Sequence, residues 1–125
     1  MKIKRILIVD DDATFQSMTK LFLEENGYKV ITENNGKSGF ERALTEKPDL
    51  ILLDIIMPVE NGLITVDRLL ADPVTKNIPI IVNSSYPTAT KVAYGKNVVG
   101  VYNKGESNEE LLSLIEKISA GRALV

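Results

Sequence analysis

Four short, unbroken runs of aliphatic residues constrain the fold of this chain more than any other feature. They are Ile6–Val9, Leu50–Leu53, Ile80–Val82 and Val98–Val101, the last interrupted by Gly100. Runs this short, with no polar alternation, are typical of strands that are buried on both faces, as in a parallel sheet. A fifth segment, Tyr28–Thr32, alternates polar and apolar residues and is predicted to be an edge strand.

Helices are predicted between the strands, where apolar residues recur every three or four positions. The expected buried faces are Phe15, Met18, Leu21 and Phe22; Phe40, Ala43 and Leu44; Leu63, Val66, Leu69 and Leu70; and Leu111, Leu114, Ile115 and Ile118. Asp12 and Asn35 are expected N-caps, and Ser107 begins a capping box. Residues Pro87–Lys96 have weaker helix propensity and are expected to form a short, mobile segment.

This alternation of strands and helices predicts an α/β fold. The expected architecture is (βα)5, a doubly wound five-stranded parallel sheet with helices on both sides. No linker, repeat or low-complexity stretch interrupts the chain. Residues 1–125 are therefore expected to form a single domain.

Composition excludes several classes of function. The chain has no cysteine and no histidine, which rules out disulfides, thiolate zinc sites, Ser-His-Asp triads and histidine-ligated metals. A net charge of -2 and the lack of a polybasic run argue against nucleic acid as a direct partner. The longest apolar run is far shorter than the roughly 20 residues of a membrane span, so a cytoplasmic protein is expected.

Polar side chains follow the predicted strands at the point where each strand ends. They are Asp10, Asp11 and Asp12 after the first strand, Asp54 after the third, Asn83, Ser84 and Ser85 after the fourth, and Asn103 and Lys104 after the fifth. Ligands of such sheets bind outside the carboxyl ends of the strands. Crowded carboxylates repel one another unless a cation lies among them. A site built from Asp10, Asp11 and Asp54 suits Mg²⁺, which prefers oxygen ligands and keeps several waters.

The same set of groups is typical of phosphoryl chemistry, in which catalysis is mostly positioning and charge stabilisation. Ser84 can donate a hydrogen bond to a phosphoryl oxygen, and Lys104 supplies a positive charge. Asp54 is the predicted acceptor, because a carboxylate can form an acyl phosphate without the help of a general base.

Four motifs occur along the chain in the order ILIVDDD, PDLILLDIIMPVENG, IPIIVNSS and VYNKG. With these motifs the chain resembles the receiver domain of bacterial two-component response regulators, the family of the chemotaxis regulator CheY. The resemblance covers essentially the whole chain, and LLDIIMPVENG is its most specific part. It implies the strand order 2-1-3-4-5.

The resemblance also implies roles for individual residues. They are Asp10 and Asp11 as the acidic pair, Asp54 as the phosphoacceptor, Ile56 as a metal ligand through its backbone carbonyl, Ser84 as the switch hydroxyl and Lys104 as the lysine of the site. Mg²⁺ would be the cofactor. The phosphodonor would be the phosphohistidine of a sensor histidine kinase or of a phosphotransfer protein. A downstream protein partner and a homodimer through the last helix and the last strands are implied as well.

Two positions depart from the family pattern. Lys104 is followed by Gly105, where the family usually has proline, which leaves open whether this peptide bond is cis. The position of the usual switch aromatic holds Val101, and Tyr102 follows one place later. Because side chains alternate along a strand, the Tyr102 ring is predicted to point to the opposite face of the sheet.

Two other functions compete with a phosphorylation-driven switch. DDDAT fits the Asp-x-Asp-x-Thr signature of haloacid-dehalogenase-like phosphatases, with Asp10 as nucleophile and Asp12 as acid–base, but this reading gives Asp54 no role. The other competitor is a degenerate receiver that acts as a phosphate-independent docking module. The complete set of acids, hydroxyl and lysine at the strand ends argues against it.

Overall fold

The computed structural model describes residues 2–55, 62–84 and 97–121. Its strands are β1 (Arg5–Val9), β2 (Lys29–Glu33), β3 (Leu50–Asp54), β4 (Ile80–Ser84) and β5 (Val98–Asn103). They pair in parallel in the order β2-β1-β3-β4-β5. The predicted fold class and strand order are therefore confirmed, and β2 is an edge strand as expected.

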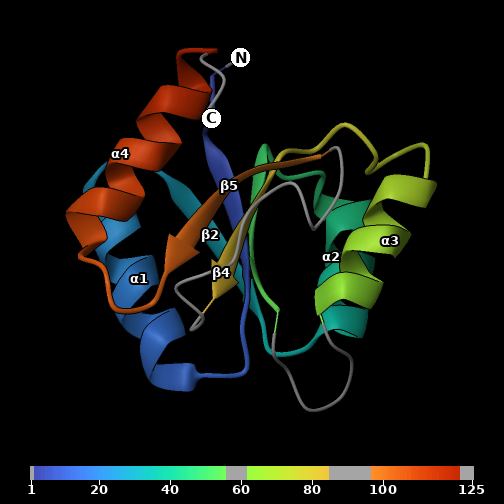
Figure 1. Ribbon diagram of the computed structural model, residues 1–125, viewed down its shortest axis with the longest axis horizontal. Helices are drawn as coiled ribbons and strands as arrows, with labels where there is room; N and C mark the ends of the chain where they lie inside the picture. The colour runs from blue at the N-terminus through green and yellow to red at the C-terminus, as the bar shows by residue number, and fades with distance from the viewer. Residues whose placement is uncertain (1, 56–61, 85–96, 122–125) are drawn as a thin grey trace.

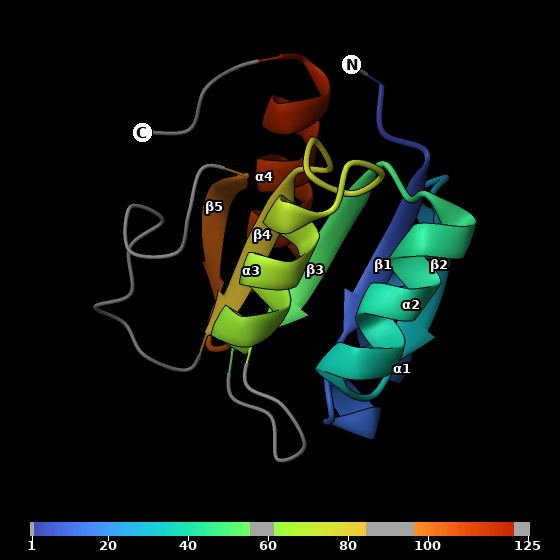
Figure 2. The same cartoon turned by 90° about the vertical axis from the view of Figure 1, so that its right-hand side faces the viewer.

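Helices cover both faces of this sheet. The described helices are α1 (Ala13–Glu25), α2 (Gly36–Glu46), α3 (Gly62–Ala71) and α4 (Asn108–Ser119). α1 and α4 lie on one face, and α2 and α3 lie on the other (Figure 1, Figure 2). Pro87–Lys96 lies outside the described residues, so a fifth helix there stays a prediction. Within the described ranges, no helix has the length and apolar character needed to cross a membrane.

Side-chain caps begin three of these helices where the sequence predicts them. The side chain of Asp12 accepts the backbone N–H of Phe15 at 3.0 Å, and that of Asn35 accepts the N–H of Ser38 at 2.9 Å. Ser107 caps α4 in the same way. These bonds satisfy N–H groups that have no partner within a helix, which is why the helix starts could be predicted locally.

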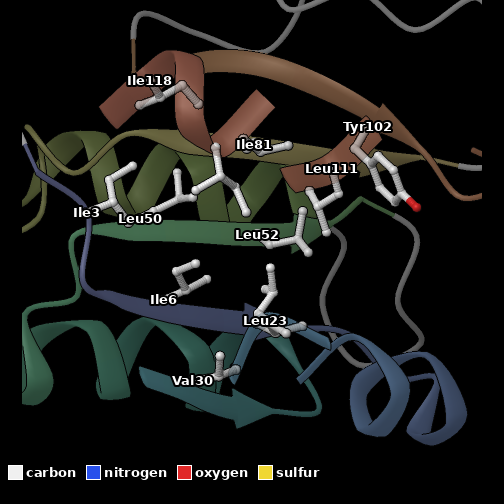
Figure 3. Packing of buried hydrophobic residues seen from close by; sticks show 12 residues of the cluster. Ile3, Ile6, Leu23, Val30, Leu50, Leu52, Ile81, Tyr102, Leu111 and Ile118 are labelled. Carbon is white, nitrogen blue, oxygen red and sulfur yellow. The ribbon is translucent and has the colours of Figure 1, made fainter. Parts of the chain in front are cut away.

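Each face of the sheet has its own hydrophobic core. Ile6 and Ile8 of β1 pack on the α1/α4 side, whereas Leu7 and Val9 pack on the α2/α3 side. Figure 3 shows the first of these clusters, in which residues from β1, β3, β4 and β5 meet α1 and α4. The apolar runs of β1 and β3 are unbroken because both faces of these strands are covered.

The predicted buried face of α1 is partly wrong. Met18 and Leu21 are 61 % and 60 % exposed, whereas Thr19 and Leu23 are buried. The physical reason is an anchor at the start of the helix. The side-chain amide of Gln16 donates to the backbone carbonyls of Asp10 and Glu33, the latter at 2.8 Å. These bonds tie the first turns of α1 to the ends of β1 and β2 and so fix the rotation of the helix.

The predicted face of α3 needs a smaller correction. Val66 and Leu69 are buried as expected, but Leu63 is 43 % exposed and Thr65 is buried in its stead. Apolar spacing alone favoured Leu63, because Thr65 carries a hydroxyl. The buried faces of α2 and α4 include Ala43, Leu111 and Ile115 and agree with the prediction.

Candidate functional site

The site lies at the carboxyl edge of the sheet. Figure 2 shows that the strand arrows point to the same edge. Asp10 follows β1, Asp54 ends β3 and Lys104 follows β5. Asn83 lies in β4 beside Asp54 in the strand register. Parallel pairing thus brings together residues that are far apart in the sequence.

Asp10 is the most enclosed acid of the site, with 0 % of its surface exposed. Its Oδ1 accepts the backbone N–H of Asp12 at 2.9 Å, and its Oδ2 accepts the side-chain amide of Asn83 at 2.9 Å. Burial raises the pKa of Asp10, although the Asp12 N–H and the charge of Lys104 oppose that rise. The carboxylate is thus held in one orientation by donors from three parts of the chain.

Lys104 joins the two buried acids. Its Nζ lies 3.1 Å from Asp10 Oδ2 and 3.4 Å from Asp54 Oδ2, and it stands over the Phe15 ring at 5.1 Å from the ring centre. Burial alone would lower the pKa of Lys104, but the charges of Asp10 and Asp54 outweigh burial and raise it. The lysine therefore stays protonated at neutral pH and can neutralise negative charge at this edge.

Three carboxylates form an acidic cluster, which consists of Asp10, Asp11 and Asp54. One oxygen from each lies within 4.8 Å of the others. Asp10 and Asp54 are buried, whereas Asp11 is exposed. Oxygen donors at this spacing fit Mg²⁺, a hard ion that takes a few carboxylate ligands and keeps waters for the remaining positions. The exposed Asp11 leaves the cluster open to solvent on one side.

Gly62 lets α3 begin directly against the site. Its backbone N–H donates to the carbonyl of Ile55 at 2.7 Å. A Cβ at this position would lie 2.5 Å from the backbone oxygen of Asp54 and 2.6 Å from the Cα of Ile55. Only a residue without a side chain fits this approach, so the glycine helps to set the backbone of the residue that the sequence predicts to be phosphorylated.

Comparison with known proteins identifies the family of this chain. A family model described as the response regulator receiver domain matches residues 6–116. The chain belongs to this family. Protein PilH of Pseudomonas aeruginosa is 36 % identical over 119 residues, which cover 94 % of this chain and 98 % of PilH.

A second relative and a solved structure are also similar to this receiver domain. Response regulator ArlR of Staphylococcus saprophyticus is 37 % identical over 112 residues, which cover 89 % of this chain but 50 % of ArlR. The chain thus spans nearly all of PilH and half of ArlR. The solved structure of chemotaxis response regulator CheY4 of Vibrio cholerae superimposes with a TM-score of 0.85 at 26 % identity, over 94 % of this chain and 99 % of CheY4.

The structure brings together four of the six site residues that the sequence predicts for this receiver domain, namely Asp10, Asp11, Asp54 and Lys104. Ser84 is the last residue of β4, and the position of its side chain lies outside the description. Ile56 also lies outside the described residues. The roles of all six remain predictions.

Sequence reasoning missed the roles of Asn83 and Gln16, which both bind Asp10. The sequence places Asn83 among the polar residues that follow the fourth apolar run, and an amide directly after Ile80–Val82 is the signal that could have indicated its role. For Gln16 no local signal exists, since its partners are the backbone carbonyls of Asp10, just after β1, and Glu33, at the end of β2.

The two departures from the family pattern have clear structural outcomes. Among the described residues no peptide bond is cis, so the Lys104–Gly105 bond is trans. Tyr102 is 2 % exposed and packs in the α1/α4 core, whereas Val101 packs toward the α2/α3 side. The prediction that the Tyr102 ring points to the face opposite Val101 is therefore confirmed.

Replacing Tyr102 with phenylalanine should lower the free energy of unfolding by about 1 kcal/mol. The hydroxyl donates to the carbonyl of Glu106 at 2.7 Å and lies 3.3 Å from that of Ser107, just before α4. Burial raises the pKa of Tyr102 above its usual 10.0, and the negative charges of Glu106 and Glu109 raise it further. The contribution of the neutral Tyr102 hydroxyl to the free energy of unfolding is therefore fully present below pH 10. It is lost as the pH rises through the pKa of Tyr102 in the folded protein.

Urea unfolding at pH 7 and at pH values above 10 measures both effects. Tyr28→Phe is the matched control at pH 7, because Tyr28 is half-buried and packs against the same core. Burial raises the pKa of Tyr28 as well, so the comparison of the two variants is made at pH 7 only. An unchanged free energy of unfolding for Tyr102→Phe would show that the hydroxyl contributes nothing to the junction of β5 and α4.

Proposed function

We propose that this chain is a phosphoacceptor switch that receives a phosphoryl group on Asp54. The supporting observation is the position of Asp54, which is 5 % exposed at the end of β3 with Lys104 Nζ 3.4 Å from its Oδ2. A carboxylate oxygen of Asp54 would attack the phosphorus of a phosphohistidine. An O–P bond forms, the P–N bond breaks, and the imidazole leaves with the electron pair.

The acidic cluster would hold Mg²⁺ through Asp10, Asp11 and Asp54, with the backbone carbonyl of Ile56 as the further predicted ligand. Bound there, the ion would neutralise charge on the phosphoryl oxygens. Lys104 lies close enough to Asp54 to neutralise another of these oxygens. Ser84 would donate its hydroxyl to the phosphoryl group and so couple phosphorylation to a shift between conformations.

The alternative of a haloacid-dehalogenase-like phosphatase is not favoured. Its nucleophile would be Asp10, which is fully buried and accepts hydrogen bonds from Asp12, Asn83 and Lys104. The family match covers residues 6–116 and belongs to receiver domains. A degenerate docking module is not favoured either, because Asp10, Asp54 and Lys104 are in contact.

As a receiver domain the protein would take its phosphoryl group from a sensor histidine kinase or a phosphotransfer protein and signal to a downstream protein. It would act as a switch and catalyse only its own phosphorylation and dephosphorylation. We further propose that residues 1–125 form one cytoplasmic domain. Homodimerisation through α4 and the last strands stays a prediction.

Incubation with Mg²⁺ and acetyl phosphate tests this function. Intact-protein mass spectrometry should show the addition of one phosphoryl group, and peptide mapping should place it on Asp54. Omitting Mg²⁺ should prevent the addition. A protein that stays unmodified under these conditions, or that carries the phosphate on Asp10 or Asp12, would contradict the proposal.

Replacing Asp11 with asparagine should weaken Mg²⁺ binding by at least about tenfold, since even residues that only support metal ligands change affinity by about 10- to 100-fold. The same change should not lower the melting temperature measured in EDTA. One of three mutually repelling charges disappears, and Lys104 contacts Asp10 and Asp54 rather than Asp11.

Isothermal titration with Mg²⁺ and thermal melts measure these effects. Asp12→Asn is the matched control, because it removes the same charge one residue away while asparagine remains an equally good N-cap for α1. The Asp12→Asn variant should weaken Mg²⁺ binding less than Asp11→Asn does, because the Asp12 side chain caps α1 and is not one of the three clustered carboxylates. Equal affinities for both variants would contradict the assignment of Asp11 as a ligand.

A further inference from the structure

Asn83 is a polar side chain that directly follows three apolar residues in β4. It is 0 % exposed and follows Ile80, Ile81 and Val82 in β4. Its Nδ2 donates to Asp10 Oδ2 at 2.9 Å, whereas no residue in the described ranges donates to its Oδ1. Within those ranges, the bond to Asp10 is the one hydrogen bond that this side chain makes.

Folding stability by itself does not account for this residue. A buried acceptor without a partner is unfavourable, as Asn83 Oδ1 is when the described residues alone are considered, and an apolar side chain of similar shape would avoid that penalty. Leucine has nearly the same size and branching as asparagine. The observation that distinguishes asparagine from leucine here is the contact of its amide with the buried Asp10 carboxylate.

The Asn83 amide and a cation bound at the acidic cluster would both interact with the negative charge of Asp10. Asp10 accepts hydrogen bonds from the Asp12 N–H, the Lys104 ammonium and the Asn83 amide. Each donor stabilises the ionised carboxylate, and hydrogen bonds to charged groups are stronger than those to neutral groups. When a divalent ion neutralises the cluster, the amide gains less from Asp10. The amide therefore stabilises the metal-free state more than the metal-bound state.

We propose that Asn83 is a positioning residue that holds the Asp10 carboxylate in the absence of metal and thereby lowers the affinity of the acidic cluster for Mg²⁺. The inference rests on the proposed function, which supplies Mg²⁺ as the ion. As a consequence, the acidic cluster would fill with Mg²⁺ at higher Mg²⁺ concentrations than in a receiver domain with an apolar residue at this position.

Isothermal titration of the Asn83→Leu variant with MgCl₂ tests the proposal. The dissociation constant for Mg²⁺ should fall by about three- to tenfold relative to the wild type, the change expected when part of one charge-assisted hydrogen bond is lost from the metal-free state only. Asn83→Ala should change the constant in the same direction. This smaller variant keeps the test valid if leucine prevents folding, which far-UV circular dichroism reports.

Thr75→Val is the matched control. Thr75 is also fully buried, and its hydroxyl donates to the carbonyl of Leu69 at 2.7 Å in the loop that leads from α3 to β4, at the opposite edge of the sheet. This variant loses a buried hydrogen bond without touching Asp10. Its affinity for Mg²⁺ should equal that of the wild type even if its stability falls.

The outcomes separate this inference from the proposed function. A wild type that binds Mg²⁺ and is phosphorylated on Asp54, with unchanged or weaker Mg²⁺ binding in both Asn83 variants, overturns the inference alone. Weaker binding would mean that the amide orients Asp10 for the metal. A wild type without measurable Mg²⁺ binding overturns the inference together with the metal part of the proposed function.

Discussion

Asp54→Asn should lower the rate of labelling by acetyl phosphate by at least about 100-fold. An amide oxygen is too weak a nucleophile to form the acyl phosphate that a carboxylate forms. The fold should survive, because asparagine is nearly isosteric with aspartate and Asp54 ends β3 at the edge of the sheet. Mass spectrometry of the variant after incubation with Mg²⁺ and acetyl phosphate measures the effect.

Asp67→Asn is the matched control for this experiment. Asp67 is an exposed residue of α3 and loses the same charge. Its labelling should match that of the wild type, which shows that the loss at position 54 does not follow from the change in net charge. If Asp54→Asn were labelled at the wild-type rate with the phosphate on Asp10, the phosphatase mechanism would replace the switch.

Gly62→Ala should destabilise the protein by about 2 kcal/mol, within the range for groups forced into packed regions. The new Cβ would lie 2.5 Å from the backbone oxygen of Asp54 and 2.6 Å from the Cα of Ile55. These are backbone atoms, so relief requires the end of β3 or the start of α3 to move. Labelling of Asp54 should fall as well, because the displaced backbone carries that side chain.

Helix propensity alone predicts that Gly62→Ala would stabilise the protein, so the sign of the change in stability distinguishes the two effects. Gly62 is the first residue of α3, and alanine favours a helix over glycine by up to about 1 kcal/mol. Gly105→Ala is the control, since a Cβ there meets nothing within 4 Å, and its effect should stay within about 0.5 kcal/mol. Urea unfolding compares the two. A Gly62→Ala variant as stable as the wild type would rule out the close approach.

Much of the fold could be predicted from local sequence. The short apolar runs predicted parallel strands that are covered on both sides, and Ile6 and Leu7 do pack into different cores. The caps at Asp12 and Asn35 could be predicted from the sequence because the side chain of a cap accepts a backbone N–H only three residues away. Where the interaction partners are close in sequence, residue type and spacing carry the information.

The rule that parallel strands end at one edge was enough to predict which acids converge. Asp10 and Asp54 meet Lys104 although the lysine is 94 positions from Asp10. The sequence predicted this assembly without any measured distance, because the position of a residue at the end of a strand fixes its edge of the sheet. It did not predict which acid is enclosed and which is exposed.

The remaining features were decided by tertiary packing alone. The rotation of α1, which exposes Met18 and Leu21, follows from the bonds of Gln16 to backbone carbonyls at the ends of β1 and β2. The contact of Asn83 with Asp10 depends on the register between neighbouring strands. Each depends on a contact between segments that meet only when the sheet has formed, namely Gln16 with Glu33 and Asn83 with Asp10. Residue type and local spacing therefore do not predict these contacts.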